Sequence, residues 1–118
     1  MVVVALLFAG ACGDSADDLG VGAQCTGNDQ CDSDTHQVCL MQFKGGYCGL
    51  SNCMHDTDCP DLSKCVMHTD GMNYCFRTCL DKSECNANRD AVNESNCSAN
   101  ITFVDQNSGI KACVPPSG

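Results

Sequence analysis

Hydrophobic positions are concentrated at the start of the chain. Val2 to Phe8 is an unbroken apolar run, and three small residues follow it. This pattern is typical of the hydrophobic and cleavage regions of a signal peptide, and the run is too short to span a bilayer. We therefore expect residues 1–11 to form a secretion leader.

Beyond the leader, short apolar stretches alternate with polar turns and cysteines. The twelve cysteines after Cys12 fall into three sets of four, and the first gap in every set is five residues long. The sets begin 28 and 26 residues apart. Such self-similarity indicates one supersecondary unit used repeatedly. We expect a cysteine-rich domain over 25–113 with the repeats 25–48, 53–75 and 79–113, followed by a tail over 114–118.

Each repeat is expected to open on a turn or a single helical turn and to close on a short β-hairpin. The first gaps read CTGNDQC, CMHDTDC and CLDKSEC, where Asn28, Asp56 and Asp81 can accept hydrogen bonds from nearby backbone N–H groups. Each last gap holds a strand, a Gly-containing turn and a return strand. The third hairpin would run from 97–104 through a turn at 107–109 to 110–113 and would use the β-favouring run 101–104, after an insertion over 86–96 with room for a short helix.

Composition indicates that disulfides stabilise the domain. Thirteen of the 118 residues are cysteine, and the chain has no Trp, two Tyr and four Phe. Chains this small and poor in large apolar side chains need covalent or metal staples. Zinc sites favour C-x2-C pairs, which the chain lacks. We predict a small disulfide-rich fold of three tandem four-cysteine repeats, each a turn plus a short β-hairpin, with little regular secondary structure.

The spacing alone leaves the cysteine pairing open, because four cysteines permit three connectivities. Adjacent pairing would tie each hairpin to nothing but itself. We prefer pairing of the first cysteine with the third and of the second with the fourth. The expected disulfides are Cys25–Cys39, Cys31–Cys48, Cys53–Cys65, Cys59–Cys75, Cys79–Cys97 and Cys85–Cys113.

Cys12 is the odd cysteine, since the other twelve can pair fully. It follows Ala-Gly-Ala, which resembles the lipobox of bacterial lipoproteins, where the cysteine is lipidated and becomes the N-terminus. The resemblance implies a lipid on Cys12 and, because Gly13 rather than Asp follows, the outer membrane. Residues 12–24 are then expected to be an acidic, flexible tether. An ordinary cleavage site with an unmodified cysteine is the alternative.

Two further resemblances bear on function. Residues 53–65, CMHDTDCPDLSKC, resemble the centre of a whey acidic protein (four-disulfide core) domain, which implies a Cys53–Cys65 disulfide. The whole chain is similar to the cysteine-rich lipoproteins of myxobacteria and related bacteria, with a lipoprotein leader, an acidic tether and C-x-x-[DN]-x-x-C units. This second resemblance implies an architecture and a place in the cell envelope but no ligand.

The net charge of −9 disfavours nucleic acid as a partner and electrostatic docking on anionic lipid. Closely spaced carboxylates at Asp32 and Asp34, and at Asp56 and Asp58, leave weak calcium binding as an alternative, although neither pair continues into a calcium-loop pattern. Copper(I) binding is another alternative, because two Met-His pairs, 54–55 and 67–68, could supply sulfur and imidazole. No metal site or cofactor is expected.

The chain carries no catalytic sequence motif, and full disulfide pairing leaves no thiolate nucleophile, so we expect no enzymatic activity. Four aromatic residues lie near the predicted hairpin ends: Phe43, Tyr47, Tyr74 and Phe76. An exposed binding surface is one interpretation of them, and a structural role in covering the disulfides is favoured. Specificity is expected at the hairpin tips, residues 43–46, 69–72 and 105–109.

The sequence therefore predicts a non-enzymatic, lipid-anchored protein of the outer membrane with a structural or binding role. Its partners would be the membrane, reached through the lipid, and a protein or carbohydrate at the surface. A secreted protease inhibitor or ligand of the four-disulfide-core type is the first alternative. A surface protein that binds calcium or copper(I) weakly is the second.

Overall fold

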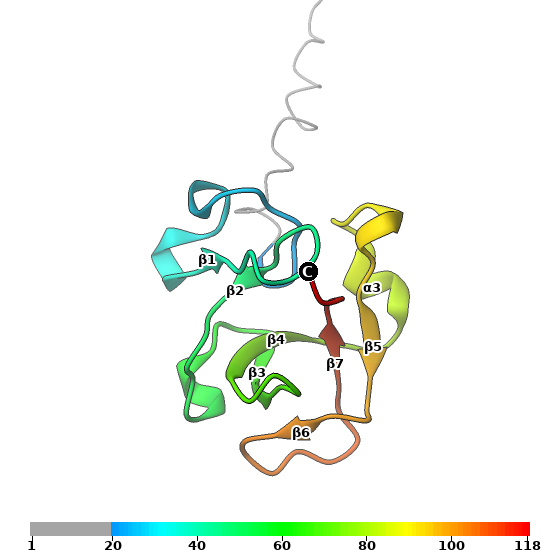
Figure 1. Cartoon of the computed structure of the whole chain (residues 1–118). Helices are drawn as coiled ribbons and strands as arrows, with labels where there is room; N and C mark the ends of the chain where they lie inside the picture. The colour runs from blue at the N-terminus through cyan, green and yellow to red at the C-terminus, as the bar shows by residue number, and fades with distance from the viewer. Residues whose placement is uncertain (1–19) are drawn as a thin grey trace, which may run out of the picture.

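A computed structural model describes residues 20–118 of the chain (Figure 1). The expected leader, the expected lipidation site Cys12 and the first part of the expected tether lie outside the described residues. Within residues 20–118, no helix is both long and apolar enough to cross a bilayer.

Short strands and helical turns make up the described domain, which confirms the predicted fold class. The strands are β1 (Val38–Cys39), β2 (Cys48–Gly49), β3 (Ser63–Met67), β4 (Asn73–Cys79), β5 (Asn96–Ser98), β6 (Thr102–Phe103) and β7 (Lys111–Val114). The helical elements are α3 (Lys82–Asn86) and the 3-10 turns η1 (Asn28–Gln30), η2 (Ser33–Thr35), η3 (Asp56–Asp58) and η4 (Ala91–Asn93).

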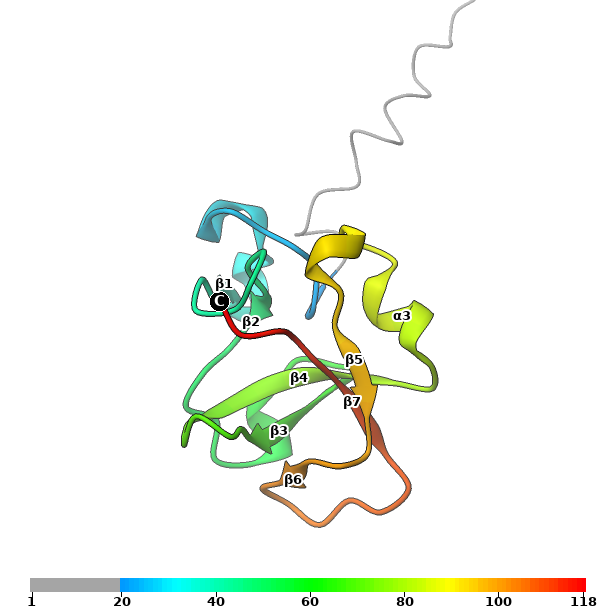
Figure 2. The ribbon, with the colours of Figure 1, turned by 45° about the vertical axis from the view of Figure 1, so that its right-hand side comes forward.

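The second and third repeats share one antiparallel sheet, whereas the first repeat has its own. β1 pairs with β2, and the other strands follow the order β5-β7-β4-β3-β6 (Figures 1 and 2). The expected third hairpin is confirmed at Cys97, because β5 pairs with β7, but it is wrong over 101–104, because β6 crosses to β3 of the second repeat. The Val104 N–H donates to the Cys65 carbonyl (3.0 Å) beside this crossing and helps to hold it.

The opening turns are built alike in the first two repeats. The side-chain oxygen of Asn28 accepts a hydrogen bond from the Cys39 N–H (2.8 Å), and that of Asp56 accepts one from the Cys65 N–H (3.0 Å). In the third repeat, Asp81 instead caps α3 by accepting from the N–H of Glu84 (3.1 Å). The polar residues predicted to stabilise these turns therefore all bond the backbone.

Six disulfides connect the described cysteines, and they are the six pairs that we preferred from the sequence. They are Cys25–Cys39, Cys31–Cys48, Cys53–Cys65, Cys59–Cys75, Cys79–Cys97 and Cys85–Cys113. In each repeat the two bridges lie close together and form a small buried cluster of their own. The domain is therefore stapled at three places along its length.

The aromatic residues form the main core between the first and second repeats. Phe43, Tyr47, Tyr74 and Phe76 are all buried, and their rings contact one another. The His68 ring also packs edge-on against Phe43, with 5.5 Å between ring centroids. The interpretation of these rings as an exposed binding surface is therefore wrong. They pack mainly on each other, because the disulfides fill separate clusters.

Both ends of the described chain belong to the folded domain, so the expected boundaries at 24 and 114 are wrong. Val21 and Ala23 are buried, and the Gly22 N–H donates to the Cys48 carbonyl (2.8 Å). At the other end, the Gly118 N–H donates to the Gln42 carbonyl (3.0 Å). These segments fold because their backbone groups find partners on the first repeat.

Arg89 connects the insertion of the third repeat to the first repeat. Its guanidinium donates to the backbone carbonyls of Gly22 (3.3 Å), Lys44 (2.8 Å), Gly46 (2.7 Å) and Asn93 (2.8 Å). The residue is 8% exposed and has no carboxylate partner among residues 20–118. Burial lowers the pKa of Arg89 from its usual value. Four carbonyl dipoles thus take the place of a counter-ion.

Candidate functional site

One open hollow of about 800 Å³ lies between the second and third repeats. We call it the basic hollow. Its walls come from η3 and the turn that follows it, from the ends of β3 and β4, from the segment leading into α3, and from the approach to β7. It is lined by residues 56–57, 59–64, 77–80, 84 and 109–111. Side chains from two repeats therefore meet at one surface.

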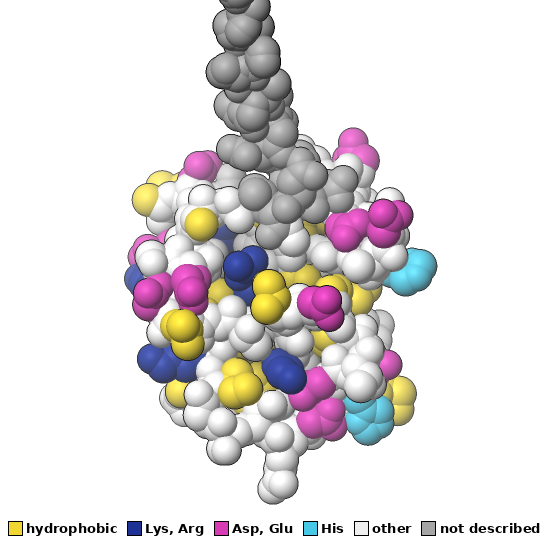
Figure 3. Space-filling view, turned by 180° about the vertical axis from the view of Figure 1, so that it is seen from behind, with side chains coloured by type: hydrophobic (Ala, Val, Ile, Leu, Met, Phe, Trp, Pro, Cys, Tyr) yellow, Lys and Arg dark blue, Asp and Glu magenta, His cyan; other side chains and the backbone are white. Residues whose placement is uncertain are grey.

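Three of the six Lys and Arg residues line the basic hollow, namely Lys64, Arg77 and Lys111. Lys64 is 3.8 Å from the Asp56 carboxylate, while Arg77 and Lys111 form no ion pair with any residue in 20–118. Seen from behind, basic side chains lie beside hydrophobic ones in the middle of the molecular surface (Figure 3). In a strongly acidic chain, the two cations without an ion pair are the positions at which an anionic ligand group can be held.

The carboxylates that line the basic hollow are largely engaged in internal bonds. Asp56 accepts hydrogen bonds from the Cys65 N–H (3.0 Å) and the Asn107 side chain (2.9 Å). Glu84 accepts one from the Leu80 N–H (2.5 Å). Asp61 lies exposed on the turn after Cys59. These bonds come from neutral amide groups and leave the carboxylates charged, so the lining carries three acids beside three bases, of which Arg77 and Lys111 have no ion-pair partner in the described chain.

Two exposed leucines line the same hollow. The side chains of Leu62 and Leu80 are 70% and 82% exposed, and Ile110 lies on the same lining. Large apolar side chains held in water beside cations are typical of binding surfaces more than of a folded surface without a partner, although single exposed leucines are common. The combination of three cations and three branched aliphatic residues defines an amphipathic lining.

Leu62 has an unusual backbone. Its φ of 67° lies in the left-handed region, which is costly for a branched aliphatic residue by about 1–3 kcal/mol. The Ser63 N–H donates to the Pro60 carbonyl (3.2 Å), so Leu62 occupies the third position of a β-turn, where Gly or Asn is preferred. The Leu62 carbonyl accepts from the Thr78 N–H (2.8 Å), and this bond holds the turn against β4. The strained backbone of Leu62 is thus held in place at the basic hollow.

Arg77 is positioned by the core behind it. Its backbone N–H donates to the Tyr47 hydroxyl (3.1 Å), which itself donates to the Cys113 carbonyl (2.9 Å). Burial holds the pKa of Tyr47 well above its usual range, so the hydroxyl keeps its proton. The buried Nε atom of Arg77 has no acceptor within residues 20–118. The core therefore fixes the backbone of Arg77, while its buried Nε is left unsatisfied by the described residues.

A second hollow, of about 400 Å³, lies beside β5, β6 and the end of β3. It is lined by Val66, Met67, His68, Thr69, Asn96, Ser98, Asn100, Ile101, Thr102 and Val114. No Lys, Arg, Asp or Glu contributes to this lining. It offers neither charge nor unsatisfied donors, and the basic hollow is the better candidate site.

The carboxylate pairs considered for calcium instead bond the backbone and side chains of their own turns. Asp32 accepts from the Asp34 N–H (3.0 Å), and Asp58 accepts from the backbone N–H groups of Met54 (2.9 Å) and His55 (3.0 Å). Those two hydrogen bonds lower the pKa of Asp58. The groups of three or more potential metal ligands found in 20–118 are cysteines, and all of these are in disulfides.

The histidines considered for copper(I) are held apart in different surroundings. His68 packs on the aromatic core, whereas His55 is exposed and its Nδ1 lies 3.1 Å from the Asp105 carboxylate. The hydrogen bond to Asp105 raises the pKa of His55. The second Asp105 oxygen accepts from the Asp56 N–H (2.7 Å), so this loop of the third repeat clasps η3. The bonds of Asp105 to His55 and to Asp56 therefore connect the third repeat to the second.

The three hairpin tips differ in their freedom to contact a partner. Phe43 and Gly46 in the first tip are buried, and Arg89 bonds the carbonyls of Lys44 and Gly46. The tip over 105–109 is bonded to η3, as described above. Residues 69–72 include exposed positions. The first tip is therefore partly built into the core, with Lys44 as its exposed residue, and specificity at the tips stays a prediction.

Sequence reasoning did not find the basic hollow. Its three cations lie far apart in the chain, and no spacing rule connects Lys64, Arg77 and Lys111. The pairing of β4 with β7 brings two of them together, since Lys111 lies opposite Cys79 and Arg77 is two residues away on the same face. The scarcity of cations in an acidic chain was the one available signal.

Comparisons with protein-family models, with curated proteins and with solved structures found no match. The structure itself defines the class of protein. The chain forms a small disulfide-rich domain with six cystines and a single short α-helix in its described part.

Proposed function

We propose that the protein is a non-enzymatic, lipid-anchored protein of the cell envelope that binds a partner through the basic hollow. The lipid on Cys12 would hold the protein at the outer membrane, as the resemblance to bacterial lipoproteins implies. The domain would present the hollow to the surroundings. A rigid scaffold that carries a variable site is a common arrangement in cystine-rich domains.

The observation that carries the binding role is the basic hollow itself. It combines an open volume of about 800 Å³, two cations without ion pairs in the described chain and two exposed leucines on a frame of six disulfides. A preformed site loses little conformational entropy on binding, because cystines already restrict the backbone. These features support recognition and supply no paired nucleophile and base.

The lipid anchor is tested by the intact mass of the protein extracted from membranes of its native host, with and without reduction. A chain that begins at Cys12, carries acyl groups and gains twelve hydrogens on reduction would match the proposal. A Cys12→Ser variant should then be lost from the membrane fraction. A mass without acyl groups, or a soluble mature protein, would exclude the anchored form.

A further inference from the structure

We propose that the basic hollow binds short acidic, apolar peptide segments of a partner protein. This inference rests on the proposed binding role and names its ligand class. The carboxylates of such a segment would lie on Arg77, Lys111 and Lys64, and its apolar side chains would contact Leu62, Leu80 and Ile110. Every one of these six side chains lines the same hollow.

Two cations without partners favour an anionic ligand. Arg77 and Lys111 have no ion-pair partner in the described chain, although Asp56, Asp61 and Glu84 also line the hollow. A guanidinium beside an ammonium matches a carboxylate, which can accept several hydrogen bonds at once. The chain as a whole is acidic, so attraction of an anion would be local to these two side chains.

The composition of the lining decides between ligand classes. A fatty acid would need a continuous apolar channel, whereas this hollow is open and includes Asp61, Ser63 and Thr78 among its apolar residues. A carbohydrate would need an aromatic face, and no Phe or Tyr contributes to the lining. A peptide supplies its own backbone donors and acceptors, and therefore fits walls that are both polar and apolar.

The backbone of Leu62 is the independent observation. A leucine at a φ of 67° is disfavoured, and a glycine there would relieve the strain, yet the chain places a 70% exposed leucine at this position. Folding alone gives no reason for this choice, because the side chain is not in the core. Contact with an apolar group of a ligand explains the choice of leucine at this position, because backbone strain retained at a surface position points to function.

The test uses the full, disulfide-bonded protein from the native host. If its mass shows a lipid, the protein is extracted from membranes and placed in phosphatidylcholine nanodiscs. If its mass shows no lipid, the protein is assayed in buffer. The probe is the peptide Leu-Glu-Leu-Asp-Leu with a zwitterionic rhodamine label, and its binding is followed by fluorescence anisotropy. The acetylated form of the same peptide is the unlabelled competitor. The matched peptides are Leu-Gln-Leu-Asn-Leu and Ser-Glu-Ser-Asp-Ser. Unlabelled peptide competes in every titration, so that binding of the dye alone is recognised.

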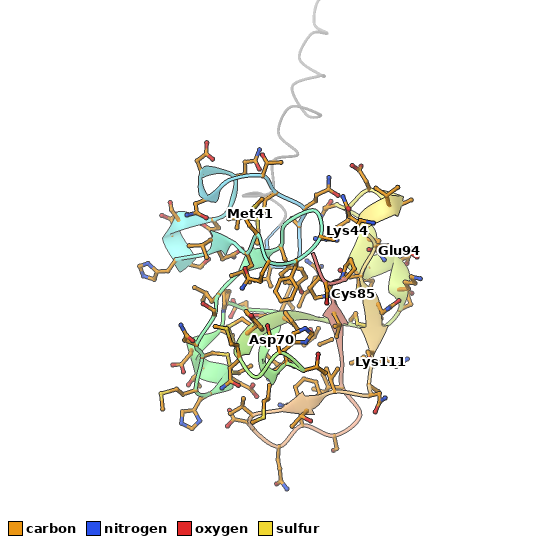
Figure 4. The ribbon with its side chains drawn as sticks, viewed as in Figure 1. Met41, Lys44, Asp70, Cys85, Glu94 and Lys111 are labelled. Carbon is orange, nitrogen blue, oxygen red and sulfur yellow. A yellow bond between two sulfur atoms is a disulfide. The ribbon has the colours of Figure 1, made fainter. Side chains whose placement is uncertain are left out.

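The acidic apolar peptide should bind about tenfold more tightly than either matched peptide, since each lacks one half of the interaction. Raising the ionic strength should weaken its binding, because the contacts are partly exposed. Arg77→Gln and Lys111→Gln should each weaken binding by about threefold to tenfold. Lys44→Gln is the matched control, because Lys44 lies on the first repeat, away from Lys111 (Figure 4), and should change binding by less than about twofold.

The apolar half has its own pair of variants. Leu80→Ser should weaken binding by about threefold to tenfold, while Val92→Ser removes an equally exposed side chain outside the hollow and should leave binding unchanged. Equal binding of all three peptides, equal effects of Lys44→Gln and Lys111→Gln, or binding of dodecanoate in place of the peptide would overturn the inference.

The two proposals fail separately. A lipidated protein that ignores the acidic apolar peptide would overturn the ligand class and leave the anchor standing. An unlipidated protein that binds this peptide through Arg77 and Lys111 would overturn the lipid anchor and leave the ligand class standing.

Discussion

The first and second repeats share one disulfide frame and differ in what surrounds it. In both, the residue three positions before the third cysteine has a positive φ, 62° at His36 and 67° at Leu62. The hairpin of the first repeat is covered by Arg89 and by the C-terminal segment, and its turn at His36 is exposed, whereas the turn at Leu62 faces the basic hollow. The two repeats therefore share a backbone conformation at this position and differ in the side chain placed there and in its surroundings.

This difference also separates stability from recognition. His tolerates the left-handed region better than a branched aliphatic residue does, so the first repeat fills its turn at low cost. The second repeat retains Leu at the same position, which folding does not favour. Changes to the closed side should thus reduce stability, and changes to the open side should reduce binding while leaving stability intact or improving it.

The largest expected effect is on the closed side, at Arg89. Arg89→Met removes four hydrogen bonds to backbone carbonyls, two of them buried, and should lower the free energy of unfolding by about 3–5 kcal/mol. Arg89→Lys keeps the charge but cannot reach four carbonyls, so it should recover only part of the loss. Guanidinium unfolding with the disulfides intact measures both variants. A loss below about 1 kcal/mol for Arg89→Met would contradict the role assigned to this residue.

The next largest expected effect comes from removing a disulfide, and it tests whether the disulfide frames of the first and second repeats are equivalent. The bridges Cys31–Cys48 and Cys59–Cys75 close loops with sequence separations of 17 and 16 residues. Replacing each pair by two serines should therefore cost a similar free energy, about 3 kcal/mol in the chain-entropy model. Unequal losses, measured by chemical unfolding, would mean that the repeats differ in more than their surroundings.

The number and spacing of the cysteines predicted the fold class. Spacing alone left the pairing open, and the preferred pairs depended on the argument that adjacent pairing would tie each hairpin only to itself. Burial of Phe43, Tyr47, Tyr74 and Phe76 was expected in one of two interpretations, as a cover over the disulfides and not as a core of their own. The third hairpin was right at Cys97 and wrong over 101–104, since the β6 pairing with β3 depends on contacts between repeats that no local pattern records. The expected domain boundaries at 24 and 114 were wrong for the same reason. Gly22 and Gly118 form hydrogen bonds with Cys48 and Gln42, which lie far away in the chain.

A smaller effect, of opposite sign, is expected on the open side. Leu62→Gly removes the penalty of a positive φ and should raise the free energy of unfolding by about 1 kcal/mol. His36→Gly should change it by less than about 0.5 kcal/mol, because His is already tolerated in that region. Denaturant midpoints of both variants give the comparison directly. Equal shifts for His36→Gly and Leu62→Gly would remove the argument that Leu62 is retained for binding.

The smallest expected effect is the pH dependence of the clasp between Asp105 and η3. The hydrogen bond to Asp105 raises the pKa of His55, so its stabilisation is complete below 6.5 and is lost as the pH rises through the raised value. Bonds from the Asp56 N–H and from His55 lower the pKa of Asp105, whose contribution is complete above 3.8 and is lost as the pH falls through the lowered value. Both contributions are present together only between these limits.

The difference in melting temperature between the native chain and Asp105→Asn should therefore be largest between about pH 4 and 6.5. His55→Gln should remove the decline above pH 6.5 and keep the one at acidic pH, because the bond from the Asp56 N–H to Asp105 is retained. Both groups are exposed, so the shift in melting temperature should be the smallest of the four effects. A pH-independent difference for Asp105→Asn would show that the clasp acts only through neutral hydrogen bonds and would contradict this prediction.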